Sequence, residues 1–328
     1  MKAAICILLF VFVGYIQARI TYDDVLDVEF ELFKVENEKS YDGVYEEQLR
    51  LQIFKDNKKL IDRQNKRYAA GEKTYMMGVN KFTDLTQEEF KRLLPPSLNS
   101  NHSLESIDYI YNPSAKDSLP SSIDWRRSGA VNPIKNQGNS GAFSWAFSAV
   151  GSLESQHFIH KGKTVFLSEQ NLIDCCESSC PIKALNYVKD NGGIDTERSY
   201  PYTCMKHSCH YEKQNIGAEV SAIVQIQSGN EDALASAVAN KGPISVCINV
   251  DSNFQYYRSG VFNEPSCSQT INHCVVIIGY GTDSVGGDYW LVRNSWGEDW
   301  GENGYIRMAR NRNNQCAIAS YAVYPLVK

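Results

Sequence analysis

Apolar residues recur at helical spacing in the first third of the chain, among lysines, aspartates, glutamates and glutamines. Between Glu46 and Asn65 these residues are Leu49, Ile53, Leu60 and Ile61. A stripe with this period is typical of an amphipathic helix. The period breaks over residues 78–84, and the capping pair Thr86 and Glu89 then predicts the start of a second, shorter helix.

The rest of the chain changes from helical to strand-like patterning. A helical run extends from Trp145 to about His160. Short strand-like segments follow at Ile244–Val250, His273–Gly279, Tyr289–Arg293 and Gly304–Arg310. A helical half followed by a β-rich half predicts an α+β domain whose two halves face each other.

The composition is that of a folded chain. The sequence has 328 residues, of which 43% are hydrophobic and 22% charged, and its net charge is −5. This length suffices for one large domain or two modest ones, each with its own core. The apolar fraction excludes intrinsic disorder, and the slightly acidic balance argues against a nucleic-acid partner.

The first 18 residues have the pattern of a signal peptide. Met1-Lys2 precedes an apolar run over Ala3–Tyr15, and the small residue Ala18 stands where cleavage is expected. The run is shorter than the about 20 residues that a spanning helix needs, and no later segment is apolar enough, so we expect no membrane span. The ten cysteines fit the secretory pathway, with an extracellular or lysosomal/endosomal destination, because disulfides persist in oxidising compartments.

Cysteine usage divides the rest of the chain in two. Residues 19–118 contain no cysteine, whereas residues 119–328 contain every cysteine outside the expected signal peptide. From Leu94 to Ser118 the composition shifts to proline, serine and asparagine, which predicts an extended linker, and Asn101 lies in a glycosylation sequon. We therefore expect a front piece at 19–118 and a separate domain at 119–328.

Motifs in both pieces resemble those of papain-like cysteine proteases. The front helix reads Glu46-x3-Arg50-x2-Ile53-Phe54-x2-Asn57-x3-Ile61-x3-Asn65, the ERFNIN pattern of their propeptides, and Gly78-x-Asn80-x-Phe82-x-Asp84 matches the companion GxNxFxD motif. The back piece carries Asn136-Gln137-Gly138, Trp145-Ala146-Phe147-Ser148, Leu167-Ser168-Glu169-Gln170, Gly242-Pro243, Asn272-His273, Gly279-Tyr280-Gly281 and Asn294-Ser295-Trp296-Gly297. In order and spacing, these motifs resemble a cathepsin L-like proenzyme.

The resemblance implies a papain-like two-lobed fold, with a helical left domain, a β-barrel-like right domain and a substrate cleft between them. It implies that residues 19–118 are an inhibitory propeptide lying in this cleft. Residues 119–328 would be a peptidase domain that binds peptide or protein substrates, and the family's chemistry uses neither a cofactor nor a metal.

By the same resemblance, four residues occupy the catalytic positions and one covers them. His273 would act as general base and acid, Asn294 would orient its imidazole, and Trp296 would shield the bond between them. Gln137 would donate a hydrogen bond to the oxyanion. Ser144 stands at the position of the nucleophile, directly before the tryptophan of its motif.

Ser144 is the main departure from the family, which places a reactive cysteine there. This chain also has Ser140 in place of a disulfide-forming cysteine, and one additional residue near Phe143. A hydroxyl is far less acidic than a thiol, so a helix N-terminus and an imidazolium that ionise cysteine do not ionise serine. Loss of the nucleophile costs on the order of 10⁶ in rate. The sequence therefore predicts a homologue that is proteolytically inactive or strongly impaired.

Two alternatives stay open. An active endopeptidase that uses Ser144, His273 and Asn294 would explain why the other site residues are kept. The second alternative is an ordinary active enzyme whose sequence contains errors at 139–144 and 177–184. A second departure favours impairment, because residues 177–183 lack the glycine pair whose exposed backbone pairs with substrate in the family.

The resemblance also implies two disulfides, Cys267–Cys316 and Cys175–Cys209. The remaining pairing stays open between Cys180–Cys204 and Cys176–Cys204. Cys274 follows the candidate catalytic histidine, but neighbours on a strand point to opposite faces. We therefore expect Cys274 and Cys247 to be buried, packing thiols rather than nucleophiles.

The propeptide motifs predict a docked state that depends on pH. Glu46, Arg50, Asn57 and Asp84 are all present. We expect residues 19–118 to fold onto the cleft and to loosen in acid, because carboxylates paired in the docked state lose their charge as the pH falls.

Overall fold

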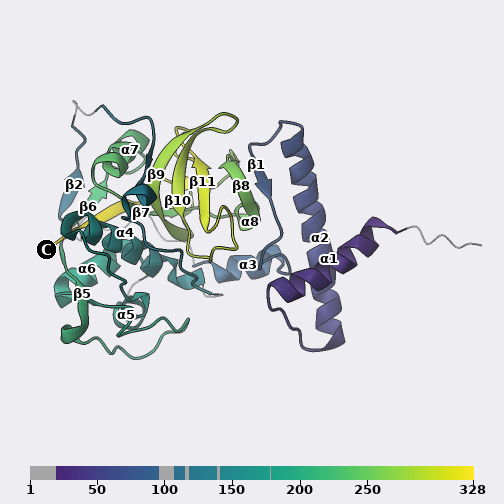
Figure 1. Cartoon of the computed structure of the whole chain (residues 1–328), viewed down its shortest axis with the longest axis horizontal. Helices are drawn as coiled ribbons and strands as arrows, with labels where there is room; N and C mark the ends of the chain where they lie inside the picture. Colours follow the sequence, from purple (N-terminus) through teal and green to yellow (C-terminus); the bar gives the residue numbers. More distant parts are fainter. Residues whose placement is uncertain (1–19, 96–106, 115–117, 139–140, 178) are drawn as a thin grey trace, which may run out of the picture.

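The computed structural model describes residues 20–95, 107–114, 118–138, 141–177 and 179–328. The expected signal peptide, the sequon at Asn101 and Ser140 lie outside these residues. The described chain is elongated, with two crossing helices at one end and a mixed helical and sheet domain at the other (Figure 1). Its helices and strands together give the α+β architecture that the sequence predicts.

Residues 20–95, which we call the front unit, form three helices and one strand. These are α1 (Tyr22–Glu36), α2 (Gly43–Ala69), β1 (Tyr75–Met77) and α3 (Gln87–Leu93). The helix expected over residues 46–65 is the central part of α2. The expected capping box is present at α3, where the Thr86 hydroxyl accepts from the Glu89 N–H and the Glu89 carboxylate accepts from the Thr86 N–H.

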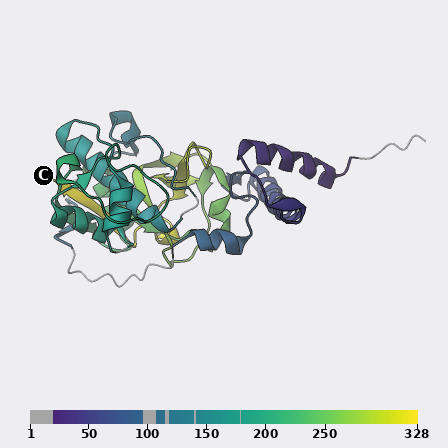
Figure 2. The same ribbon diagram turned by 90° about the horizontal axis from the view of Figure 1, so that it is seen from below.

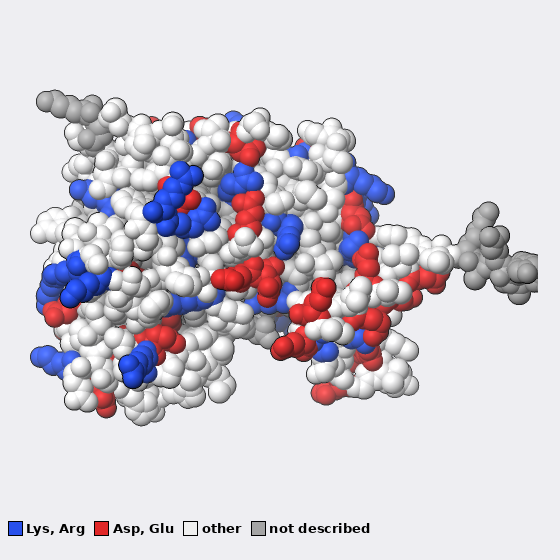
Figure 3. Space-filling view, viewed as in Figure 1, with Lys and Arg blue, Asp and Glu red and all other residues white. Residues whose placement is uncertain are grey.

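Helix α1 crosses α2 on an aromatic cluster. The ring of Phe54 lies 5.4 Å from that of Phe30 and 5.1 Å from that of Phe33, measured between centroids. Acidic side chains gather on the outside of this end of the molecule (Figure 3). Some pair across the crossing, as in Lys55–Asp27, Lys58–Glu29 and Lys59–Asp23. Since exposed ion pairs contribute at most about 1 kcal/mol each, the buried rings are the main support of the crossing.

One sheet forms the centre of the mixed domain. In spatial order its strands are β1, β8 (Tyr257–Phe262), β11 (Tyr305–Ala309), β10 (Gly287–Arg293), β9 (His273–Asp283), β7 (Ile244–Ile248), β12 (Ala322–Val327), β6 (Val220–Ile226) and β2 (Tyr109–Tyr111). The four expected strands correspond to β7, β9, β10 and β11. Both end strands, β1 and β2, come from residues before 119, so the expected propeptide covers both edges of the sheet.

Shorter elements complete the domain. β3 (Ile123–Asp124) pairs with β9, and β4 (Ile194–Asp195) pairs with β5 (Ile216–Ala218). The helices are α4 (Ser144–Lys161), α5 (Glu169–Cys175), α6 (Pro181–Asn191), α7 (Glu231–Asn240) and α8 (Ser252–Gln255). Within the described residues, no helix combines the length and apolar character that a bilayer crossing requires.

Helix α4 forms the boundary between the two halves. It coincides with the helical run expected from Trp145, and its residues from Ser144 to Gln156 are buried. It packs against α5 and α6 on one side and against β7, β9 and β12 on the other. Glycine at position 151 permits the approach to β10, since a Cβ there would lie 2.8 Å from Nη1 of Arg293. The middle of α4 can therefore lie close to the side chain of Arg293.

The front unit extends the molecule along its long axis, as the view from below also shows (Figure 2). It adds its strand β1 antiparallel to β8, with Tyr75 opposite Gly260. Gly260 has φ +91°, and a Cβ there would lie 2.4 Å from the Thr74 carbonyl oxygen. Only glycine therefore allows this close approach of the two strands.

Candidate active site

His273 and Asn294 meet where two neighbouring strands end. His273 is the first residue of β9, and Asn294 follows the last residue of β10. The His273 Nε2 and the Asn294 Oδ1 are 2.9 Å apart. Because an amide oxygen only accepts hydrogen bonds, the ring donates from Nε2–H, and its Nδ1 carries the lone pair. The Trp296 ring lies 4.8 Å from the imidazole and covers the pair.

The environment of His273 keeps its ring neutral. The side chain is fully buried. Burial lowers the pKa of His273 to about 4, and the hydrogen bond with Asn294 opposes this shift without cancelling it. The Nδ1 of His273 is buried without a hydrogen-bond partner among the described residues.

Ser144 lies at the N-terminus of α4, as its motif predicts, but its hydroxyl bonds elsewhere. The Oγ accepts a hydrogen bond of 3.2 Å from the backbone N–H of Cys274, and the side chain is fully buried. Since His273 Nδ1 has no partner, the described chain has no hydrogen bond between Ser144 and this ring nitrogen. The structure thus brings Ser144 to the strand that carries His273 without the bond through which a histidine would take a serine proton.

Gln137 is held by three contacts, two of them to Ser295, the residue after Asn294. Its side-chain Oε1 accepts a hydrogen bond from the Ser295 hydroxyl. Its backbone N–H donates to the Ser295 carbonyl over 2.8 Å, and its own carbonyl accepts from the Tyr202 hydroxyl over 2.9 Å. Gln137 is fully buried. Tyr202, which the motifs do not indicate, therefore helps to hold the chain segment that carries the candidate oxyanion donor.

Cys247 and Cys274 form a disulfide, so the expectation of two unpaired thiols was wrong. They lie directly opposite each other in the antiparallel pair of β7 and β9. Their N–H groups bond to the Tyr321 carbonyl and to Ser144 rather than to each other's strand. In an antiparallel ladder, opposite residues that do not exchange backbone hydrogen bonds bring their side chains closest together. Both cysteines lie in predicted strands, but the sequence does not say that these two strands are neighbours or in which register they pair.

The other cysteines partly follow the family pattern. The expected bridges Cys175–Cys209 and Cys267–Cys316 are both present. Neither the Cys180–Cys204 nor the Cys176–Cys204 bridge is present in the described chain. Cys180 is buried and occupies the N-cap position of α6, directly before Pro181, without a capping hydrogen bond from its side chain. The segment without the glycine pair therefore leads directly into a helix.

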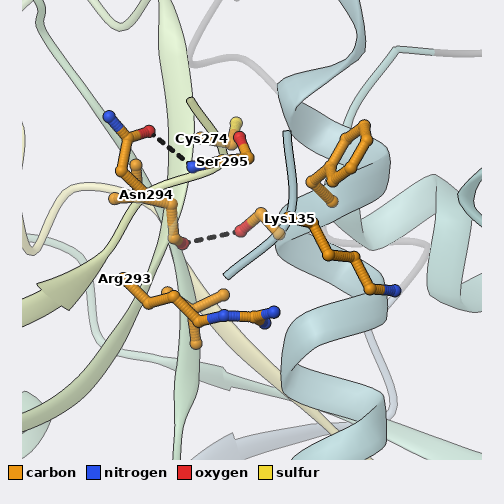
Figure 4. A pocket seen from close by; sticks show the side chains of 9 residues that line it. Lys135, Cys274, Arg293, Asn294 and Ser295 are labelled. Carbon is orange, nitrogen blue, oxygen red and sulfur yellow. Dashed lines mark hydrogen bonds between the residues drawn. The ribbon is translucent and has the colours of Figure 1, made fainter. Parts of the chain in front are cut away.

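The space beside Asn294, between α4 and β9, is almost filled. A cavity of about 10 Å³ is lined by Phe147, Ser148, Cys274, Val275, Asn294 and Ser295, together with Lys135, Val276 and Arg293 (Figure 4). This volume is that of about one water molecule. Arg293 donates to the Pro133 carbonyl over 2.6 Å, and Lys135 pairs with Glu154 and Glu169. Both cations therefore have partners of their own, a backbone carbonyl for Arg293 and carboxylates of α4 and α5 for Lys135.

Aromatic rings of the front unit cover Trp296. The rings of Phe82 and Phe90 meet that of Trp296 edge-on, with centroids 5.2 and 5.8 Å away. The Asn80 amide donates to the Gln255 carbonyl over 2.8 Å, and the Gln255 amide donates to the Phe82 carbonyl over 3.0 Å. The front unit is thus seated directly on the residue that shields His273 and Asn294.

Comparison with known proteins identifies this arrangement. The model of the papain family cysteine protease matches residues 119–326, and that of the cathepsin propeptide inhibitor domain (I29) matches residues 30–90. The chain belongs to the papain family of cysteine proteases. Its fold is the papain-like fold preceded by a propeptide domain, as the sequence predicts.

Relatives of this family match nearly the whole chain. Cathepsin L1 of Drosophila melanogaster is 43% identical over 345 residues, which cover 100% of this chain and 92% of that protein. Cathepsin L of Sarcophaga peregrina is 44% identical over 322 residues, covering 93% and 94%. The structure of digestive procathepsin L2 from Tenebrio molitor larval midgut superposes with a TM-score of 0.87 at 39% identity, covering 92% of this chain and 99% of that one. The chain is therefore a cathepsin L-like member of the papain family.

The propeptide motifs hold the front unit together from within. The Asp84 carboxylate accepts from the Lys39 ammonium and from the Tyr41 hydroxyl, both at 2.9 Å. Arg50 donates to the Glu89 carboxylate over 2.9 Å, and the Asn57 amide donates to the carbonyls of Thr83 and Leu85. These bonds fix the loop that presents Phe82 to Trp296.

Proposed function

We propose that this protein is a cathepsin L-like homologue that binds peptide or protein ligands with little or no peptidase activity. Residues 19–118 would serve as its propeptide and residues 119–328 as its peptidase-like domain. The observation that carries the proposal is the hydrogen bond from Cys274 N–H to Ser144 Oγ, beside a His273 Nδ1 without a partner. The protein would act in the secretory pathway, outside the cell or in lysosomes and endosomes.

The chemistry of the proposed site argues against efficient turnover. A cysteine peptidase relies on a thiolate beside an imidazolium, whereas the alcohol of Ser144 needs a base to remove its proton. His273, with a pKa lowered to about 4 by burial, is a weak base. Serine peptidases place a carboxylate behind the histidine to stabilise the imidazolium, and the neutral amide of Asn294 supplies less of this stabilisation.

An active endopeptidase that uses Ser144 is the second candidate. It is favoured by the 2.9 Å contact between His273 and Asn294 under Trp296. In that case Ser144 would attack the peptide carbonyl, His273 would take its proton, and Gln137 would donate to the oxyanion. An activated serine would be labelled by a fluorophosphonate probe, whereas an inert one would stay unmodified.

A gain-of-function variant tests the proposal. The full-length wild type, Ser144→Cys and Ser144→Ala are incubated with a dipeptidyl fluorogenic substrate, before and after limited proteolysis of the propeptide. We expect wild type and Ser144→Ala to be equally inactive. If Ser144→Cys cleaves the substrate several orders of magnitude faster than wild type, the hydroxyl alone accounts for the lost activity. If its rate does not rise, the geometry around residue 144 is also unsuited to catalysis. Turnover by the wild type far above that of Ser144→Ala would contradict the proposal.

A further inference from the structure

The propeptide region also contacts the peptidase domain at the edge of the sheet opposite the front unit. β2 pairs in parallel with β6, with Tyr109 opposite Val224 and Tyr111 opposite Ile226. The front unit instead adds β1 to β8 at the other end of the strand order, and Figure 1 shows β1 and β2 far apart. The two contacts are therefore separate attachments of one propeptide region.

Asp108 fixes the start of β2. Its N–H donates to the Ile223 carbonyl over 3.1 Å, and its carboxylate accepts from the Ile223 N–H over 2.8 Å. The same carboxylate accepts from the Lys189 ammonium over 2.9 Å. Hydrogen bonds between charged groups are about twice as strong as neutral ones. Asp108 thus combines strand pairing with a charge contact to α6.

Tyr111 anchors the other end of β2. Its side chain is buried, its hydroxyl lies 2.9 Å from the Ser236 Oγ of α7, and its ring centroid lies 6.4 Å from that of Tyr324 in β12. Tyr109 and Ile110 between the anchors are exposed. Extended peptides bind to sheet edges through backbone pairing, and pockets for individual side chains select the sequence.

We propose that the edge of β6, together with Lys189, Ser236 and Tyr324, is a peptide-binding site for an extended segment that carries Asp and, three residues later, Tyr. Its occupant is residues 107–112 of this chain. The site attaches the propeptide region independently of the front unit. The inference rests on the proposed propeptide at 19–118, but not on the loss of peptidase activity.

Two consequences follow from this attachment. When residues 107–112 are bound, a front unit that leaves Trp296 is joined to the domain by residues 96–106 rather than 96–118, and the shorter linker raises its effective concentration near the site. The occupant also covers the edge of β6, whose unpaired N–H and C=O groups would otherwise be open to pairing with another chain.

Hydrogen exchange in the full-length chain tests the attachment. The reporter is the amide of Ile223, because its N–H is donated to Asp108. In the Asp108→Ala/Tyr111→Ala variant we expect this amide to exchange about tenfold faster or more, because it loses one hydrogen bond to a charged group. Ile110→Ala, on the same strand but exposed, is the matched control and should leave the exchange unchanged. Lys189→Ala removes the charge contact from the peptidase side and should also speed the exchange. Unchanged exchange at Ile223 in both Asp108→Ala/Tyr111→Ala and Lys189→Ala would overturn the proposal.

A labelled peptide tests the binding site itself. A fluorescent peptide with the sequence of residues 107–114 is added to full-length Asp108→Ala/Tyr111→Ala and to wild type. We expect saturable binding to the variant, whose own strand is weakened, and none to wild type, whose site is occupied. A peptide carrying the same two alanines should not bind the variant. Absence of binding to the variant, or equal binding of the two peptides, would overturn the proposal, and neither result depends on peptidase activity.

Discussion

The backbone N–H of Cys274 donates to the Oγ of Ser144 over 3.2 Å. Cys274 is also joined to Cys247 on the neighbouring strand and directly follows His273. The disulfide therefore constrains the backbone group that holds the hydroxyl. Helix α4 places Ser144 in a buried position, and β9 supplies the N–H group to which its hydroxyl oxygen is bonded.

The neutral state of His273 predicts a specific titration. Burial lowers the pKa of His273 to about 4, so we expect its ring signals to titrate near pH 4 in NMR spectra of the full-length protein. The unfolded chain, with a histidine pKa of about 6.5, binds the proton more readily, so stability falls as the pH falls through this interval. Between pH 7 and pH 5 this difference corresponds to about 2 kcal/mol.

His273→Gln removes this titration and serves as the control. Its urea unfolding free energy should depend less on pH between 7 and 5 than that of the wild type. A ring that titrates near pH 6.5 would show that the imidazole is accessible to solvent or paired with a negative charge.

The Cys247–Cys274 bridge should be found in the purified protein. Proteolytic digestion without reduction is expected to yield one mass corresponding to the peptides of β7 and β9 joined together, which reduction separates. The bridge closes a loop with a sequence separation of 27 residues, so Cys247→Ala/Cys274→Ala should lower the unfolding free energy by about 3 kcal/mol. Recovery of both cysteines as alkylated thiols from the unreduced protein would contradict the bridge.

Glu89 makes the front unit sensitive to strong acid. The hydrogen bond from Arg50 lowers the pKa of Glu89 to about 2. A carboxylate with a lowered pKa stabilises the fold above its unfolded pKa of about 4.3, and this contribution is lost as the pH falls toward 2. We expect the thermal unfolding midpoint of the full-length chain to fall over this range, and to fall less in Glu89→Gln.

The matched control for this measurement is the exposed neighbour Glu88. Glu88→Gln should keep the pH dependence of the wild type. Identical pH profiles for wild type and Glu89→Gln would show that the pair with Arg50 does not contribute. The acid loosening predicted from the sequence would then depend on other groups.

The sequence predicted most of the fold because its motifs are local. The ERFNIN spacing placed Phe54 and Ile61 on the buried side of α2, and Thr86 with Glu89 marked the start of α3. The pairing of His273 with Asn294 followed from a resemblance whose spacing this chain keeps.

Features that depend on strand register could not be predicted in this way. Cys247 and Cys274 pair because β7 and β9 align them, and sequence periodicity does not specify which strands are neighbours. The attachment of β2 was missed for the same reason, since residues 107–114 have the composition of a linker. The hydrogen bond of Ser144 depends on both α4 and β9 and was not visible in either motif.

Peptide hydrolysis by the wild-type protein tests the central claim most directly. Purified wild type and Ser144→Ala, both with the propeptide removed by limited proteolysis, are compared at equal concentration by the rate of release from a dipeptidyl fluorogenic substrate across pH 4 to 8. The account predicts that the two rates are indistinguishable. A wild-type rate comparable to that of an active cathepsin, abolished by Ser144→Ala, would contradict it.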